Sequence, residues 1–354
     1  MTAAGELLSD RLQVPSDPRG FYDYALAHGF GDGLPLFAPT EDAVRALLDA
    51  VPLPADHVLG LLAPANVDCT VEKAAVNAAM AGVAPLAFGY VVAALEAIMD
   101  KRFNWSALAA TTSSVTAMIV VNGPKRAEYE FDMETGCMGG AAGRGSMTVG
   151  RAVQLTLRNV GGQKVGVTSK SVFGQPARAT GLCFGEWEEE SPWPSLAERS
   201  GFAPTDEVVT VHGGKGTFPF ADIHNDDARD LLLLVAKTLA FPLANMYLGT
   251  AAGHGETVVC FNPVWAQRFG AAFPDVEDLR AFIQEHAWQP ADLWPEGNRA
   301  ILEGQGRIDA QGRVHICERA DQWIPVVCGG RGSLHGVALT SWGESNACSV
   351  AVRR

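Results

Sequence analysis

Two short segments in the second half of the chain combine glycines with a basic residue and a hydroxyl. They are His212–Thr217 (HGGKGT) and Cys328–Ser333 (CGGRGS), and each follows an apolar run. Successive glycine amides can turn inward around an anion, to which the Lys or Arg adds a full charge. We expect a carboxylate, thiocarboxylate or phosphate there, and tight turns between strands are the alternative. The residues expected to bind the anion are Gly329, Gly330, Arg331 and Ser333.

Cysteines beside these glycines are candidate nucleophiles. A thiol next to inward-facing backbone amides is acidified and becomes reactive. Cys328 is the first candidate and Cys137, within Gly136–Gly145, is the second. His335 follows the second glycine segment and is a candidate second acid. A role as a small buried apolar residue is the alternative for each cysteine.

Acid–base residues are expected at the start of a helix over Thr70–Ala81. Glu72 would move a proton, and Lys73 would stabilise developing negative charge. Asn77 lies one turn after Lys73 on a helix otherwise rich in Ala, Val and Met, where an unpartnered polar group is costly. The alternative is that Glu72 only complements the positive end of the helix.

A third anion-binding arrangement is expected where Gly136–Gly145 leads into a helix. Ser146 is the expected N-cap, and Arg144 and Arg151 flank the turn. A solvated surface position is the alternative for Arg151. Two further substrate contacts are expected from Thr111 and Asn122.

An acidic and aromatic run occupies Glu186–Trp193 (EWEEESPW). Because two tryptophans and a proline interrupt it, part of the run is expected to pack inward. A buried Glu186 would have a raised pKa and act as a general acid or base. A solvated acidic surface is the alternative.

Composition excludes several classes of protein. The formal charge is −13, and no basic stretch exists for nucleic acid or anionic membranes. The first residues lack the pattern of a secretion signal and no apolar run reaches the length of a membrane span, so we expect a cytoplasmic protein. Seven scattered cysteines without C-x-x-C favour neither disulfides nor zinc. Without P-loop, dinucleotide or paired-histidine spacing, we expect no cofactor and no metal.

Helix and strand signals alternate along the chain, which predicts an α/β fold with largely parallel sheets and crossover helices. Because the two glycine segments are alike, we expect two related lobes around a cleft, over 1–205 and 206–354. Strands are expected at Met118–Asn122, Val208–Val211, Val258–Phe261 and Ile324–Val327. Helices are expected at Phe21–His28, Glu41–Val51, Thr70–Ala81, Leu86–Met99, from Ser146 to Val160, Asp227–Phe241 and Val276–His286.

The order of several short motifs resembles a large, mostly uncharacterised bacterial family. The motifs are DGLP at 32–35, PT at 39–40, TVEK at 70–73, N-x-x-MAG at 77–82, ATT at 110–112, VNGP at 121–124, TVGRA at 148–152, NVGG at 159–162, GQP at 174–176 and EEESPW at 188–193. Members are often encoded beside, or fused to, a small protein with a selenocysteine-or-cysteine-Gly-Ser-Cys motif. The resemblance therefore implies a thiol or selenol partner protein. The chain departs from the pattern at Val83, where relatives often show Cys, and at Cys69 and Cys137.

These observations favour an enzyme that acts on a small anionic carboxylate or thioester metabolite. Acid–base or nucleophilic chemistry would make it a lyase or a hydrolase, with the glycine segments and Glu72 around one cavity. A thiol-dependent redox or sulfur-transfer component is the first alternative, and a non-catalytic partner subunit is the second. Apolar runs such as Leu231–Val235 leave open whether copies of the chain associate as a homo-oligomer.

Overall fold

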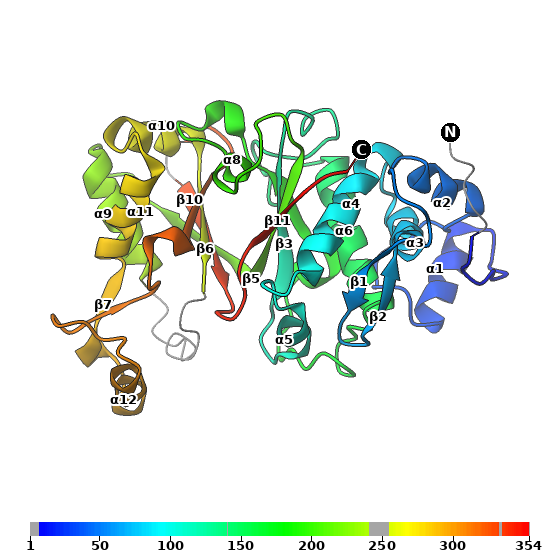
Figure 1. Ribbon diagram of the computed structural model, residues 1–354, viewed down its shortest axis with the longest axis horizontal. Helices are drawn as coiled ribbons and strands as arrows, with labels where there is room; N and C mark the ends of the chain where they lie inside the picture. The colour runs from blue at the N-terminus through cyan, green and yellow to red at the C-terminus, as the bar shows by residue number, and fades with distance from the viewer. Residues whose placement is uncertain (1–6, 140, 241–254, 333–334, 354) are drawn as a thin grey trace.

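A computed structural model of the chain describes residues 7–139, 141–240, 255–332 and 335–353. Its central element is the long strand β5, Val208–Ala221, which pairs with three other strands. The first half of β5 pairs with β3, Thr116–Asn122, and with β11, Cys348–Ala351. The second half pairs with β10, His335–Ser341. One strand therefore joins two parts of a single sheet (Figure 1).

The sheet has seven strands in the order β4-β3-β5-β10-β6-β9, with β11 beside β5. The remaining members are β4, Leu182–Gly185, β6, Thr257–Phe261, and β9, Trp323–Val327. Two short hairpin-like pairs lie outside it: β1, Val58–Leu62, with β2, Val67–Thr70, and β7, Trp288–Pro290, with β8, Arg313–His315.

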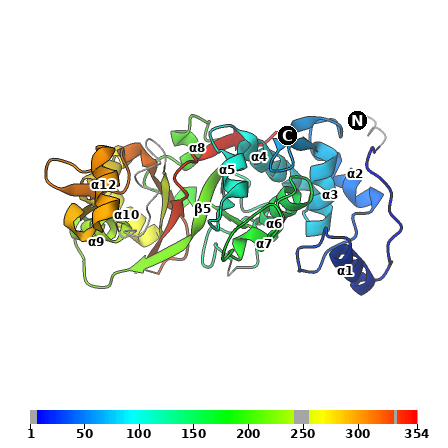
Figure 2. The same cartoon turned by 90° about the horizontal axis from the view of Figure 1, so that it is seen from below.

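Helices lie at both ends of the sheet (Figures 1 and 2). On one side are α1 Pro18–Ala27, α2 Glu41–Leu48, α3 Val71–Ala81, α4 Phe88–Met99, α5 Trp105–Ala110, α6 Arg144–Asn159 and α7 Ala177–Thr180. The others are α8 Leu196–Arg199, α9 Ala228–Leu239, α10 Pro263–Ala272, α11 Val276–His286 and α12 Glu296–Gly304.

Helix boundaries follow the capping signals in the sequence. The Thr70 side chain accepts from the Lys73 amide to begin α3, and Gly82 ends it with φ +79°. α11 has the expected bounds, whereas α6 begins at Arg144 and so includes Ser146 instead of being capped by it. Phe241, the expected end of α9, lies outside the described residues.

Alternating strand residues face different hydrophobic cores. In β3, Ala117, Ile119 and Val121 belong to the core that includes α3, α4 and α6. The intervening Met118 and Val120 belong to a second core, which they share with inward-facing residues of β4, β6, β9 and β10. A third core lies between α9, α10, α11 and the outer faces of β6 and β9. The inner faces of the two parts of the sheet therefore pack on each other, with helices outside.

The expected α/β class is confirmed, but the sheet is not largely parallel. β3 with β4 and β6 with β9 are parallel, as crossover helices require. The pairings of β5 with β3, β10 and β11, and of β10 with β6, are antiparallel. β10 and β11, which were not predicted, take part in three of these four pairings, whereas β3 and β5 were predicted but pair antiparallel. The structure does not show two related lobes around a cleft.

The first glycine segment was expected to be a loop and is instead part of β5. A side chain at Gly213 would meet Leu108, and one at Gly214 would meet Met118. These glycines therefore allow close packing on the two faces of the strand, whereas the second segment follows the end of β9. The likeness of the two sequences does not reflect a shared local structure.

Among the described residues, no helix combines the length and apolar composition that crossing a lipid bilayer requires.

His212 makes the stability of the sheet depend on acid. It is 1% exposed in β5, and its Nε2 lies 2.9 Å from the Leu339 carbonyl oxygen of β10. Burial lowers its pKa from 6.5 to about 4. Between pH 6.5 and about pH 4, His212 is therefore protonated in the unfolded chain but neutral in the folded chain. We expect the free energy of unfolding to fall by about 2–3 kcal/mol between pH 7 and pH 4.5 from this group alone.

Urea unfolding of the wild type and of His212→Gln at both pH values measures this contribution. Glutamine keeps an N–H donor for Leu339 and does not titrate in this range. The variant should therefore lose less stability on acidification than the wild type. Equal losses would show that His212 does not contribute.

Candidate functional site: a pocket lined by three thiols

Three cysteines from distant parts of the chain line one pocket of about 530 Å³. Cys260 lies on the inner face of β6, Cys328 directly follows β9, and Cys137 lies in the turn region after β3. Each is at most 5% exposed. The remaining wall residues are Thr135, Gly136, Met138, Asn262, Gly329, Gly330, Arg331, Gly332, His335, Gly336 and Val337.

Strand pairing positions Cys328 next to Cys260. β6 and β9 are parallel, with Cys260 opposite Val326, and the Cys328 amide donates to the Phe261 carbonyl oxygen at 3.0 Å. Cys328 lies two residues beyond Val326 and therefore on the same face as Cys260. Both thiols consequently face the core between the two parts of the sheet.

The three thiols affect one another's ionisation. The neighbouring Cys328 thiol, together with burial, raises the pKa of Cys137. For Cys328 the Cys137 thiol lowers the pKa, but the Cys260 thiol and burial outweigh it, so its pKa lies well above the ordinary value. Both thiols are neutral at pH 7.

Backbone contacts bring Cys137 to the other two cysteines. The Gly329 amide donates to the Met133 carbonyl oxygen at 2.8 Å, which joins the end of β9 to the segment that carries Cys137. Gly329 has φ +90°, a conformation that favours glycine. A side chain at Gly330 would meet the Thr135 hydroxyl. Gly329 and Gly330 are thus required for the close contact between the end of β9 and the segment that carries Cys137.

Arg331 is engaged by the acidic run. Its guanidinium is 2.5 Å from a carboxylate oxygen of Glu190 and stacks over the Trp187 ring at 5.2 Å. It remains at the rim of the pocket, with 63% of its side chain exposed. The expected anion-binding arginine therefore has a partner already. Ser333 lies outside the described residues.

His335 and Asn262 form the opposite rim. His335 is exposed at the start of β10, and its carbonyl oxygen accepts from the Asn262 side-chain amide at 2.5 Å. The Asn262 side-chain oxygen caps α10 by accepting from the Trp265 amide. Two hydrogen bonds therefore fix Asn262, and the exposed His335 contributes to the wall of the pocket.

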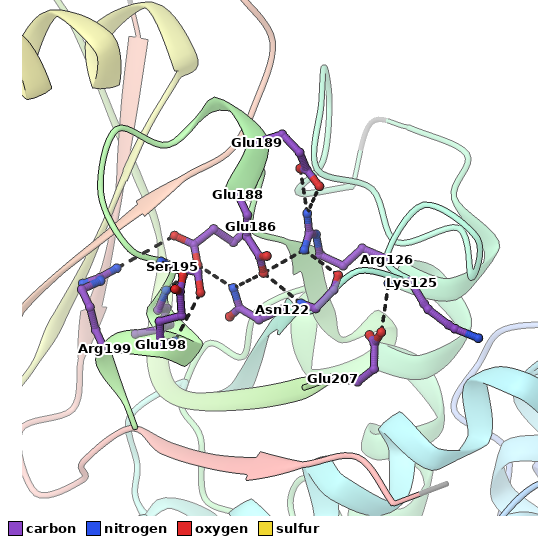
Figure 3. Close-up of polar contacts among 12 residues, drawn as sticks. Asn122, Lys125, Arg126, Glu186, Glu188, Glu189, Ser195, Glu198, Arg199 and Glu207 are labelled. Atoms are coloured by element: carbon purple, nitrogen blue, oxygen red, sulfur yellow. Dashed lines mark hydrogen bonds and ion pairs between the residues drawn. The ribbon is translucent and has the colours of Figure 1, made fainter. Parts of the chain in front are cut away.

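Glu186 and Asn122 were expected at the site and meet instead in a buried polar network (Figure 3). The Asn122 amide nitrogen donates to Glu186 at 2.6 Å and to Glu188 at 2.7 Å. Burial raises the pKa of Glu186, against the lowering effects of Arg199, Asn122 and the Leu196 amide. Glu186 does not line the thiol pocket, although the next residue, Trp187, donates its amide to Val327 of β9.

Arg126 closes the same network. It is 1% exposed and contacts Glu188 at 2.8 Å, Glu189 at 2.7 Å and the Gly123 carbonyl oxygen at 2.5 Å. Figure 3 shows three of the four glutamates of the acidic run, Glu186, Glu188 and Glu189, gathered around Asn122 and Arg126. The run therefore anchors the end of β3, with Glu186 buried and the Glu189 side chain still 64% exposed.

Glu72, Lys73 and Asn77 line a different cavity. The Glu72 carboxylate accepts the amides of Leu8 and Ser9, and the Lys73 ammonium donates to the Asp68 carbonyl oxygen at 2.7 Å. The expected single cavity for Glu72, Arg144 and Arg331 is therefore not formed.

The other predicted binding residues hold segments of the chain together. Arg144 donates to the Gly82 carbonyl oxygen, and Arg151 makes two 2.9 Å contacts with Asp32. The Ser146 hydroxyl accepts from the Asp132 amide, and the Thr111 hydroxyl accepts from the Ser113 amide. Each of these groups has an internal partner, which explains why they do not converge on a ligand.

Cys260 is the site residue that sequence reasoning missed. Its strand was expected, and alternation places it on the same face as Val258, but nothing local marks that face as lining a pocket. Within the described ranges no group of three or more His, Cys, Asp or Glu side chains is arranged to hold a metal ion.

Arg126 and Arg331 contact the same acidic run from buried and exposed positions. Replacing a buried partner leaves carboxylates uncompensated, whereas an exposed ion pair contributes little. We expect Arg126→Met to lower the free energy of unfolding by about 3 kcal/mol and Arg331→Met by less than about 1 kcal/mol, measured by urea unfolding. Similar losses from both variants would contradict a structural role specific to Arg126.

Comparison with known proteins adds no assignment. A search against protein-family models gave no match, and a search of curated proteins gave none either. The case for the site rests on its own geometry.

Proposed function

We propose that the chain is a thiol-dependent redox component that exchanges electrons with a disulfide bound in the thiol pocket. The observation that carries this proposal is the position of Cys328, which lines one pocket together with Cys137 and Cys260. Cysteines that line one pocket are candidates for a disulfide, and the pocket gives a reactant access to them.

The environment of the pocket keeps both thiols protonated at rest. The neighbouring thiols and burial raise the pKa of Cys137 and Cys328, so each must lose its proton before its sulfur can attack. A protein disulfide carries no charge, so the oxidised form places no ion in the buried core. The resting dithiol and the disulfide are therefore both compatible with this environment.

The exchange has two balanced steps. Cys328 loses its proton, with the His335 imidazole at the rim as the acceptor, and its sulfur attacks the substrate disulfide. A mixed disulfide forms and the first substrate thiolate leaves and takes up a proton. Cys137 then loses its proton and attacks the Cys328 sulfur, which releases the second substrate thiol. Two electrons pass from the protein dithiol to the substrate, and the Cys137–Cys328 disulfide is the oxidised product.

Lyase or hydrolase chemistry finds less support. It needs a base beside the bound anion, but Glu72 holds two backbone amides in another cavity, and Arg331 is paired with Glu190. The thiol or selenol partner that the family resemblance implies would be a natural source of the disulfide. The identity of the substrate disulfide and the reductant that restores the dithiol belong to the proposal.

Treatment of the reduced protein with excess oxidised glutathione tests the proposal. We expect an intact mass lower by two hydrogen atoms, and peptide mapping that joins Cys137 to Cys328. Phenylarsine oxide, which binds two neighbouring thiols, should block the reaction. The Cys328→Ser variant should form no disulfide. Cys69 is a buried cysteine of β2, and the Cys69→Ser variant should react like the wild type.

Two results would overturn this function. One is a protein that stays fully reduced under these conditions while remaining folded by circular dichroism. The other is a mass gain of a single sulfur atom when a persulfide is supplied, together with no disulfide, which would favour sulfur transfer.

A further inference from the structure

One stretch of this acidic chain carries charges of a single sign. From Thr135 to Gly185 the sequence has six Lys and Arg residues and no Asp or Glu, although acidic residues outnumber basic ones over the whole chain. Arg144 and Arg151 come first and have the partners described above. The other four lie at the end of α6, on the loop that follows it and on α7: Arg158, Lys164, Lys170 and Arg178. Any counter-charge for them must come from outside the stretch.

Helix and strand spacing place Arg158 near the start of β3. In α6 the Gln154 side-chain amide donates to the Ala117 carbonyl oxygen of β3 at 3.5 Å. One turn earlier, Gly150 packs on β4 at the level of Ile119 of β3. The helix therefore runs toward the start of β3, and Arg158, one turn after Gln154, continues the same face in that direction. Its Nε atom is buried and has no hydrogen-bond partner among the described residues.

Arg178 approaches the same region from α7, which lies beside α6 (Figure 2). Its Nη2 atom donates to the Ser169 hydroxyl at 2.9 Å. The Nη1 atom of the same guanidinium is buried and finds no acceptor in the described part of the chain. Burial alone lowers the pKa of Arg178. A nearby carboxylate would act in the opposite direction, so the charge of this guanidinium is not compensated within the described chain.

The loop between α6 and α7 joins the surroundings of the two arginines. Ser169 of this loop is fully buried and is the partner of Arg178. Two residues later, the Ser171 hydroxyl shares a hydrogen bond of 3.0 Å with the hydroxyl of Ser114, which directly precedes the region of β3 that Arg158 approaches. The loop therefore connects both guanidinium groups to one end of β3.

Gln163 adds a third buried donor to this region. It is 8% exposed, and its side-chain Nε2 atom has no partner within the described ranges. Its backbone amide donates to the carbonyl oxygen of Leu157, the residue before Arg158, at 3.1 Å. The next residue, Lys164, accepts from the Ser169 amide at 3.0 Å. Gln163 therefore lies between Arg158 and the serine that binds Arg178.

The three buried donor atoms need an acceptor that the described chain does not supply. Neither Arg158 nor Arg178 forms an ion pair within 4.0 Å with any described residue. Lys170 is also engaged away from acids, because its ammonium donates to the Gly166 carbonyl oxygen at 3.3 Å. Buried polar groups in native proteins almost always have a partner. Donors and positive charge without acceptors thus indicate a site for an anion.

We propose that Arg158, Gln163 and Arg178 bind a phosphate group, either as the free ion or as part of a small organic molecule. A phosphate group presents several acceptor oxygens and up to two negative charges, and the planar guanidinium fork matches its geometry. A carboxylate offers only two oxygens and one charge, and so satisfies fewer of these donors. This site contains none of the three thiols, so it stands independently of the redox proposal.

Isothermal titration calorimetry with inorganic phosphate, at constant ionic strength, tests the proposal. The wild type should bind phosphate about tenfold or more tightly than acetate, because phosphate engages more charge-assisted hydrogen bonds. Arg158→Met and Arg178→Met should each weaken phosphate binding about tenfold or more, because each removes such a bond. The matched control Arg19→Met removes the same charge from an exposed ion pair with Asp23 on α1, and it should bind phosphate like the wild type.

Gln163→Glu tests the location without removing an arginine. The substitution keeps the shape of the side chain and supplies a carboxylate between the two guanidinium groups. We expect the variant to bind phosphate about tenfold or more weakly, because the new carboxylate occupies the donors and repels the anion. It should also unfold at a higher temperature, measured by circular dichroism, because a counter-ion compensates the buried charge. An unchanged phosphate affinity, or a lower unfolding temperature, would overturn the location.

Phenyl phosphate, compared with inorganic phosphate, distinguishes the two sources of the phosphate group. Tighter binding of phenyl phosphate would assign the site to an organic phosphate, and tighter binding of inorganic phosphate would assign it to the free ion. Failure of the wild type to bind either compound would overturn the proposal. So would equal affinity for phosphate and acetate, or phosphate binding that survives both Arg158→Met and Arg178→Met.

Discussion

The meeting of two backbones at the end of β9 is the constraint on which the thiol pocket depends. The Gly329 amide donates to Met133, and the Trp187 amide donates to Val327. These bonds join a strand of the second half of the chain to two segments of the first half. These hydrogen bonds hold Cys137 and Cys328 in one pocket, although the two residues follow strands in different parts of the sheet. The glycines matter here because they let main chains approach closely.

Much of the fold follows from local signals, whereas the way in which its parts meet does not. Apolar runs identified β3, β6 and β9, and capping residues marked α3 and α11. The prediction of a loop at HGGKGT was wrong, because the sequence does not distinguish glycines that allow close packing in a strand from glycines that form a turn. What decides between them is the neighbouring strand, and β10 lies more than a hundred residues away from β5 along the chain.

The candidate site was predictable only in part for a similar reason. Cys137, Cys328 and His335 were singled out from their sequence neighbours, and they do line one pocket. Three arginines were predicted to bind an anionic ligand, but each contacts another residue of the chain. Arg144 donates to the Gly82 carbonyl oxygen, Arg151 pairs with Asp32 and Arg331 pairs with Glu190. A charged side chain in a sequence gives no indication of whether its counter-ion is a ligand or another residue. Only the fold answers that question.

The place of β5 also bears on how the chain folds during synthesis. β11 pairs with its first half, at Val208–Val211, and β10 pairs with its second half. Neither partner exists until the ribosome has added more than a hundred further residues. One edge of β5 is therefore exposed over that interval, and exposed strand edges favour association between chains. That edge is fully paired only when both β10 and β11 have been synthesised.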